Sequence, residues 1–202
     1  MSATVKVFWL FGRSAAGKTT LARRLHGALR DRNLPALYLD GDEMRSGLSA
    51  DLGFTPAARL ENHRRCAEVA RLAVTQGFNV VVSTIAPECS HRDEVQKILG
   101  AHLVWFYIHA PLDICVQRDP KGLYRKARAG QLQQLLDCPF DVPRPREREN
   151  YIDTVAQNID DCHQFIFDVV CRRLMTVDLA AVTNKSIPLR AALFSHHSPS
   201  CD

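Results

Sequence analysis

The stretch Gly12-Arg13-Ser14-Ala15-Ala16-Gly17-Lys18-Thr19 decides the fold, because it satisfies the pattern G-x-x-x-x-G-K-[S/T]. An apolar run, Val5–Phe11, precedes it and predicts a strand. Thr19–Leu29 follows it with apolar residues at helical spacing and predicts a helix. A turn in this place points its backbone N–H groups and the positive end of the helix dipole at a polyphosphate. The stretch therefore predicts a phosphate-binding loop, the P-loop.

Within the P-loop, two side chains have distinct expected roles. Lys18 is expected to reach the β- and γ-phosphates of ATP, and the Thr19 hydroxyl to bind Mg²⁺. We expect the nucleotide to contact the whole loop, which comprises Gly12, Arg13, Ser14, Ala15, Ala16, Gly17, Lys18, Thr19 and Thr20.

The rest of the chain alternates short apolar runs with helical patterns, which is typical of βαβ units and a parallel sheet. We expect further strands at Ala36–Leu39, Asn79–Ile85 and Leu103–Ile108, and a candidate edge strand at Met175–Leu179. Helices are expected at Ala57–Gln76, Leu112–Arg118 and Asp153–Leu174. The predicted fold class is α/β, a P-loop NTPase-type three-layer fold with a central parallel five-stranded sheet and a basic lid.

Length and composition favour one globular domain over residues 1–202. Apolar residues make up 46% and charged residues 24%, which is ordinary globular usage. A lid is expected at about 119–148 and a peripheral tail at about 180–202, because the first segment is basic and poor in apolar runs. Residues 118–130 hold five basic side chains against one acidic.

Charge, hydropathy and cysteine usage narrow the class of protein. The net charge of +4 is too small to indicate nucleic-acid binding by itself. The longest apolar stretch, Leu103–Ile108, is far shorter than a membrane span. Seven scattered cysteines without a C-x-x-C pair favour reduced thiols over a zinc site. We therefore expect a cytoplasmic protein with no membrane and no nucleic-acid partner.

A pair of carboxylates follows the second predicted strand, as Asp40-Gly41-Asp42. The third predicted strand carries no aspartate, so the acids of this site are expected one strand away from the usual place. Residues at the carboxyl ends of parallel strands face the same crevice. Phosphoryl transfer to an alcohol needs metal ions and a group that accepts the hydroxyl proton. Asp40 and Asp42 are candidates for both roles, with a plain turn as the alternative.

The chain resembles the adenylylsulfate kinases, which transfer the γ-phosphate of ATP to the 3′-hydroxyl of adenosine 5′-phosphosulfate (APS). The resemblance runs from about Phe8 to Thr154. It is carried by the P-loop, by Leu39-Asp40-Gly41-Asp42, by Asp51-Leu52-Gly53-Phe54, and most specifically by the run Arg118–Gly130, which reads RDPKGLYRKARAG.

Residue by residue, the resemblance implies a site. Phe54 would stack on the acceptor's base, and Arg45, Arg59 and Asn62 would hold its phosphosulfate and ribose. Lys121 on the lid would lie close to the transferring group and belongs with Lys18, Asp40 and Asp42 among the expected catalytic residues. Further implied contacts are Asp42, Ile85, Ala86, Lys121 and Leu123 to the acceptor, Arg118 to the nucleotide, and Thr19 with Asp42 to Mg²⁺. Without the resemblance, Phe54 reads as core, and Arg59, Arg64 and Arg65 read as a solvated helix face.

Three regions depart from the family pattern: the P-loop, the stretch Ile85–Cys89 and the lid. Ala15 replaces a glycine, which is tolerable only if φ there is negative. Ala86 replaces a serine, and Cys89 replaces a basic residue. The lid segment Gly130–Asp137 lacks the aromatic that closes the far side of the acceptor's adenine, and Leu132, Leu135 or Leu136 would have to replace it in part.

The sequence thus predicts a kinase that binds MgATP and phosphorylates APS or a closely similar nucleotide conjugate, with a homodimer left open. One alternative is a kinase for a sugar hydroxyl on another conjugate, such as cytidine diphosphoramidate. A second is a non-catalytic nucleotide-binding relic, which predicts the loss of a catalytic residue that is in fact kept. A third, nucleic-acid binding through the basic lid, predicts affinity that falls steeply with salt.

Overall fold

Five parallel strands form the centre of the molecule. The computed structural model describes residues 5–130 and 140–175. The strand order is β2-β3-β1-β4-β5, so the P-loop strand is central. The strands are β1 (Val7–Phe11), β2 (Ala36–Asp40), β3 (Asn79–Thr84), β4 (Leu103–His109) and β5 (Tyr151–Asp153). Every pairing between neighbours is parallel, which brings the carboxyl ends of all five strands to one edge.

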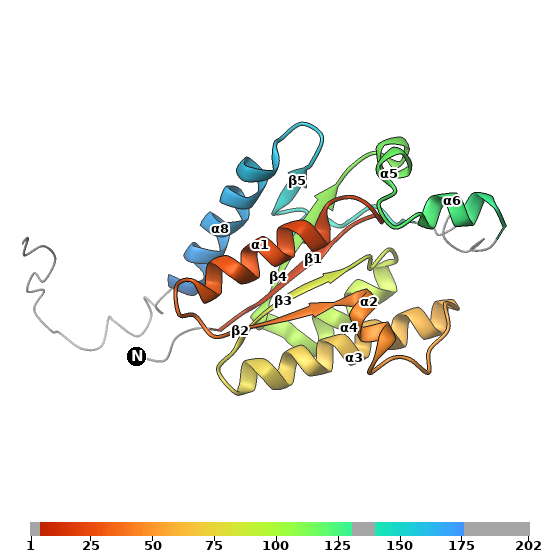
Figure 1. The fold of residues 1–202 in the computed structure, drawn as a ribbon. Coiled ribbons are helices and arrows are strands. Elements are labelled where there is room, and N and C mark those ends of the chain that lie inside the picture. Colours follow the sequence, from red (N-terminus) through yellow and green to blue (C-terminus); the bar gives the residue numbers. More distant parts are fainter. Residues whose placement is uncertain (1–4, 131–139, 176–202) are drawn as a thin grey trace, which may run out of the picture.

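Helices cover both faces of the sheet and give three layers (Figure 1). α1 and α8 lie on one face, α3 and α4 on the other, while α5 and α6 project beyond the carboxyl edge. The helices are α1 (Lys18–Arg30), α2 (Gly41–Ser46), α3 (Pro56–Thr75), α4 (Cys89–Leu99), α5 (Leu112–Arg118), α6 (Leu123–Arg128) and α8 (Ile159–Met175). Two short 3₁₀ turns occur at Gly100–His102 and Pro145–Glu147.

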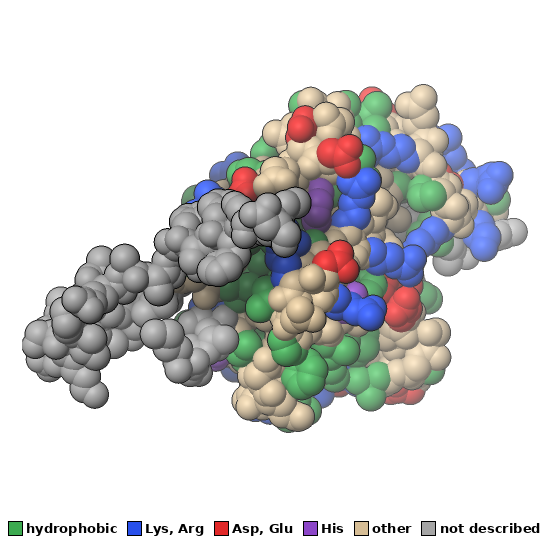
Figure 2. Space-filling model, turned by 60° about the vertical axis from the view of Figure 1, so that its left-hand side comes forward, with side chains coloured by type: hydrophobic (Ala, Val, Ile, Leu, Met, Phe, Trp, Pro, Cys, Tyr) green, Lys and Arg blue, Asp and Glu red, His purple; other side chains and the backbone are tan. Residues whose placement is uncertain are grey.

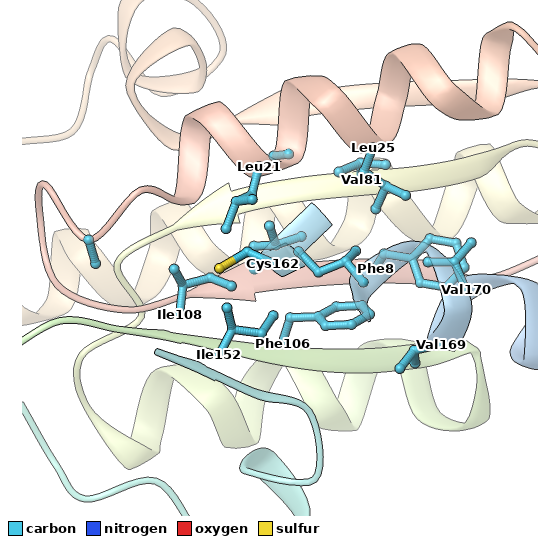
Figure 3. Packing of buried hydrophobic residues seen from close by; sticks show 14 of the residues in the cluster. Phe8, Leu21, Leu25, Val81, Phe106, Ile108, Ile152, Cys162, Val169 and Val170 are labelled. Atoms are coloured by element: carbon cyan, nitrogen blue, oxygen red, sulfur yellow. The ribbon is translucent and has the colours of Figure 1, made fainter. Parts of the chain in front are cut away.

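The core is divided by the sheet into two apolar clusters. Figure 3 shows the cluster beneath α1 and α8, where Phe8 and Phe106 from neighbouring strands meet Leu25 and Val170 from the two helices. The other cluster places Trp9, Phe11 and Trp105 against α3 and α4. Because alternate residues of a strand point to opposite faces, a central strand that is buried on both sides is apolar throughout, as β1 is.

The predicted α/β class and the strands built on β1 to β4 are confirmed, with ends that shift by one or two residues. The fifth strand was wrongly placed. It is Tyr151–Asp153, whereas Met175 ends α8 and residues 176–179 lie outside the described chain. The predicted helix start at Asp153 is also wrong, because Asp153 ends β5 and the helix begins at Ile159. β5 has three residues, of which only Ile152 is buried, so it is too short to show a period-two pattern.

The structure also contains helices that the sequence did not predict. α2, α4 and α6 were not predicted. α2 begins where the Asp40 side chain accepts a hydrogen bond from the Asp42 amide, which is an N-cap rather than a simple turn. α6 shows that the predicted lid contains helix up to Arg128, and the lid residues 131–139, like the predicted tail, lie outside the described part. The five cysteines that the structure describes are free, and no described helix is long and apolar enough to cross a membrane.

Candidate active site

The P-loop wraps the amino end of α1 at the carboxyl end of β1. Gly12 has a φ of 151°, and a Cβ there would lie 2.0 Å from the Ile108 carbonyl oxygen, so only glycine fits. Gly17 has a φ of 101°, which likewise favours glycine. Lys18 is buried, and its Nζ donates to the Arg13 carbonyl at 2.7 Å. Burial lowers the pKa of Lys18 to about 8.

The expectation for Ala15 is wrong. Its φ is +63°, in the left-handed region, rather than negative. A left-handed conformation costs an L-residue about 1–2 kcal/mol, because Cβ approaches the following carbonyl oxygen. The loop therefore keeps its shape with alanine in place, at the expense of local strain that the surrounding strand and helix hold.

Asp40 is the centre of a hydrogen-bond network at the end of β2. Its Oδ2 accepts from the hydroxyls of Tyr38 at 2.8 Å, Ser83 at 2.9 Å and Thr19 at 3.2 Å. Its Oδ1 accepts from the Asp42 amide at 2.9 Å. Burial alone would raise the pKa of Asp40, but the hydrogen bonds from Tyr38, the Asp42 amide and Ser83 outweigh it and hold the pKa below its usual range. Asp40 is thereby an ionised carboxylate in a fixed orientation.

Asp42 faces the lid. Its Oδ2 accepts from Lys121 Nζ at 2.5 Å, which joins the first turn of α2 to the loop between α5 and α6. The hydrogen bond from Lys121 to Asp42 raises the pKa of the lysine, so it stays charged. Both groups are more than half exposed, so their pairing is open to competition from a ligand.

Phe54 is not a core residue, since 52% of it is exposed. Arg45 places its guanidinium 4.7 Å from the centre of the Phe54 ring and donates from Nη1 to the Gly53 carbonyl at 2.9 Å. Arg59 donates from Nε to the Phe54 carbonyl at 3.0 Å. One face of the ring is thus covered by a cation, and the aromatic is held at the amino end of α3 with the two arginines beside it.

Arg64 and Arg65, further along α3, form ion pairs away from the Phe54 ring. Arg65 forms hydrogen bonds with both carboxylate oxygens of Asp51, at 2.6 and 2.9 Å, and with Glu61. Arg64 is likewise paired with Glu61. The pair from Arg65 joins the Asp51 turn to the helix, whereas the pair from Arg64 lies within α3 on its partly exposed face. Neither arginine lines the cavity.

A single cavity of about 1100 Å³ runs between the P-loop, the carboxyl ends of β2 and β3, the start of α3 and the lid. It brings together most of the predicted site residues: Ser14, Ala15, Gly17, Lys18, Thr19, Thr20, Asp40, Asp42, Arg45, Phe54, Arg59, Asn62, Ile85, Arg118, Lys121 and Leu123. It does not bring in four others, namely Gly12, Arg13, Ala16 and Ala86. Ala86 is fully buried behind the cavity wall.

Arg118 connects the lid to the P-loop end of the cavity. Its guanidinium donates to the Thr154 hydroxyl at 2.9 Å and to the Thr154 carbonyl at 2.8 Å. Thr154 in turn lies against Gly17, 3.6 Å from where a Cβ on that glycine would be. α6 adds further cations: in Figure 2, Lys and Arg side chains gather toward the right of the view, where Figure 1 places α6.

Several cavity residues escaped the sequence reasoning. Ser83 could have been found, since it lies near the end of β3 and pairs with Asp40 at the end of β2. Tyr38 does not line the cavity, but its hydroxyl group contacts Asp40, and its two-residue spacing to Asp40 could have indicated this. His63 gave no signal: it lines the cavity yet is buried, and its ring stacks on His91 at 4.7 Å. Burial lowers the pKa of His63 to about 3, so it is neutral.

The few oxygen ligands near the P-loop suit Mg²⁺, which needs only one or two protein ligands, better than they suit a metal ion bound entirely by protein side chains. Within the described residues, no group of three or more His, Cys, Asp or Glu could hold a metal ion. Mg²⁺ is usually bound by one or two protein oxygens, with phosphates and water completing its octahedron. Thr19 and Asp42 offer such oxygens on the cavity wall.

Comparisons with known proteins agree on one family. A family model described as adenylylsulphate kinase matches residues 4–152. The adenylyl-sulfate kinase of Paraburkholderia xenovorans is 47% identical, over 68% of this chain and 78% of that protein. The one from Geotalea uraniireducens is 43% identical, over 83% and 81%. The solved Mycobacterium tuberculosis APS kinase in complex with AMPPNP and APS is 35% identical, with a TM-score of 0.77, covering 83% of this chain and 98% of that one.

Proposed function

The chain belongs to the adenylylsulphate kinase family, and from that premise we propose that it transfers the γ-phosphoryl group of ATP to the 3′-hydroxyl of APS. The observation that carries the proposal is the single cavity, which is lined at one end by the P-loop and at the other by Phe54 with Arg45 and Arg59. A donor and an acceptor can therefore meet inside one enclosure.

At the donor end, the P-loop amides and the amino end of α1 would hold the phosphates of ATP. Lys18 would leave the Arg13 carbonyl and contact the β- and γ-phosphates. Arg118 and Thr154, beside Gly17, would border the nucleotide. Thr19 and Asp42 would hold Mg²⁺, which would neutralise charge on the phosphates when bound.

At the acceptor end, the exposed ring of Phe54 would stack on the adenine of APS, with Arg45 already fixed near the ring. The planar guanidinium groups of Arg45 and Arg59 suit the paired oxygens of a phosphosulfate. Asn62 lies one turn after Arg59 in α3 and lines the cavity, and it would contact the ribose.

Catalysis would depend on the positioning of the two substrates and on charged groups near the transferred phosphoryl group, and Asp40 and Asp42 would have different roles. Asp40 is occupied by four hydrogen bonds, so it would orient Thr19 and the start of α2. Asp42 has an exposed carboxylate that the structure pairs only with Lys121, within the described chain. Asp42 would accept the proton of the 3′-hydroxyl, and Lys121 would move to the transferring phosphoryl group.

An acceptor screen tests the proposal. Release of ADP is measured with MgATP and APS, with a cytidine conjugate such as cytidine diphosphoramidate, and with no acceptor. We expect ADP release that depends on APS. A preference for the cytidine conjugate would show that the acceptor is a cytidine conjugate rather than APS. If neither conjugate causes ADP release, the result would support the alternative of a non-catalytic relic.

Three further expectations are kept as proposals. We propose that residues 1–202 form one domain, that the protein acts in the cytoplasm, and that its partner is the nucleotide conjugate, with a homodimer left open. Limited proteolysis tests whether the chain forms one domain, and size-exclusion chromatography with light scattering tests whether it forms a homodimer.

A further inference from the structure

Arg92 on α4 and Glu147 on the Pro145–Glu147 turn form a buried ion pair. Both side chains are almost fully buried, and Arg92 Nε donates to Glu147 Oε2 at 3.0 Å. The Phe11 ring lies 5.4 Å from the guanidinium carbon. Burying two charges costs several kcal/mol per ion in desolvation, so such a pair contributes little net stability by itself. The bonds that Arg92 makes besides the ion pair are therefore the informative ones.

On one side, Arg92 holds the loop between β3 and α4. Its Nη1 donates to the Ala86 carbonyl at 2.8 Å and to the Pro87 carbonyl at 3.0 Å. Ala86 has a φ of +40°, which an L-residue adopts only when its surroundings impose it. The residues on either side of it, Ile85 and Pro87, both line the main cavity. Arg92 thus supports a strained turn whose flanks form the cavity wall.

On the other side, Arg92 fixes the last part of the predicted lid, residues 141–147. Its Nη2 donates to the Asp141 carbonyl at 3.4 Å. The Asp141 amide donates to the Pro87 carbonyl at 2.9 Å, and its carboxylate accepts from the Cys89 amide at 2.6 Å. Glu147 Oε2 also accepts from the Arg144 amide at 2.7 Å. One guanidinium therefore joins the β3–α4 loop to residues 141–147.

The joined pieces border the acceptor end. A small pocket beside the main cavity is lined by Arg59, Ile85, Pro87 and Phe140, together with Arg13 and Ser14 of the P-loop and Tyr124 of α6. Arg59 belongs to the proposed acceptor site, and Phe140 directly precedes the segment that Arg92 holds. The loop and the segment thus meet where the phosphosulfate of the acceptor is expected.

We infer that Arg92 is a positioning residue for the acceptor: through Ala86 and Pro87 it fixes the cavity wall opposite Arg59, and Glu147 fixes Arg92. The inference rests on the proposed function. It predicts that removing Arg92 raises the KM for the acceptor more than the KM for ATP. Among the described residues, the backbone hydrogen bond between the P-loop and this loop runs from the Gly12 amide to the Ile85 carbonyl, and Arg13 lies 5.0 Å from the centre of the Phe140 ring.

The test separates position from stability with three variants of the full chain. Arg92→Met leaves Glu147 buried without its partner and should be strongly destabilised. The double variant Arg92→Met with Glu147→Gln removes both charges and keeps an oxygen for the Arg144 amide, so its thermal midpoint should recover. Glu94→Gln is the matched control, because it removes the ion pair between Glu94 and Lys97 within α4 but leaves Arg92 in place.

We expect the double variant to keep an acceptor KM raised about tenfold or more despite its recovered stability, since small misplacements near the reacting groups are costly. Hydrogen exchange should also speed up at the Cys89 and Asp141 amides. Glu94→Gln should match the unmodified chain in both readouts. A double variant with an unchanged acceptor KM and unchanged exchange would overturn the inference. If the unmodified chain phosphorylates no conjugate, the proposed function fails, and the exchange measurement alone then decides whether Arg92 holds the loop.

Discussion

The two ends of the cavity are built in different ways. At the donor end, the wall comes from one short run of the chain, the P-loop, in which Gly12 leaves no room for a side chain and Gly17 has a positive φ. At the acceptor end, the wall comes from α2, α3 and the β3–α4 loop, and it acts through side chains such as Phe54 and Arg45. The donor end is therefore rigid and local, while the acceptor end depends on contacts between distant segments and can change one side chain at a time.

The largest effect should follow from the loss of the donor-end cation. We expect Lys18→Ala to lower kcat/KM by about 10³-fold, as for the loss of a preorganised charge at a reacting group. The fold should persist, because the variant removes a buried cation whose hydrogen bond in the structure is to the Arg13 carbonyl. Release of ADP gives the rate, and Lys97→Ala, at an exposed lysine of α4, is the control. Unimpaired turnover by Lys18→Ala would show that the P-loop does not bind the transferred phosphate.

The acceptor end should respond differently. We expect Phe54→Ala to raise the KM for APS by about 10- to 100-fold, since stacking of a base on an aromatic ring is worth roughly 1–3 kcal/mol. The KM for ATP should stay the same. Phe78→Ala, at another exposed phenylalanine beyond the far end of α3, serves as the control. Equal changes in both KM values would show that the two ends are not separate.

The same contrast explains what the sequence could predict. The P-loop, Asp40 and Asp42 were identified because their chemistry lies in short runs after strands. The role of Phe54 came from the resemblance alone, since nothing in a Gly-Phe pair shows that the ring is exposed. Arg92, Ser83 and His63 act through contacts across many residues, and the positive φ of Ala15 is imposed by tertiary structure. The three-residue β5 was missed because it is too short for a periodic pattern.

A pH profile sharpens the account of the donor end. Burial lowers the pKa of Lys18 to about 8, so the free protein loses this charge as the pH rises above that value. Because the charged form would hold the phosphates, kcat/KM for ATP should fall about tenfold per pH unit above about pH 8. Lys121, whose pKa is raised, should stay charged in this window. Lys18→Arg should abolish the fall, whereas a flat profile in the unmodified chain would contradict the assignment.

The smallest effect concerns strain in the P-loop. Ala15 adopts a φ of +63°, so Ala15→Gly should stabilise the protein by about 1 kcal/mol in urea unfolding. Activity should remain within about twofold, because the loop acts through its backbone. The matched change Ala28→Gly in the last turn of α1 should destabilise the protein instead, by up to about 1 kcal/mol. Destabilisation by Ala15→Gly would mean that the alanine side chain makes a contact that outweighs the strain.

The most direct test of the central claim is the identity of the product. The protein is incubated with MgATP and APS, and the product is analysed by phosphorus NMR and mass spectrometry. A donor and an acceptor that share one cavity should give ADP and one new phosphomonoester on the ribose 3′-oxygen of APS, in equal amounts. Equal amounts of ADP and inorganic phosphate, with APS recovered unchanged, would contradict the claim that this cavity joins the two substrates.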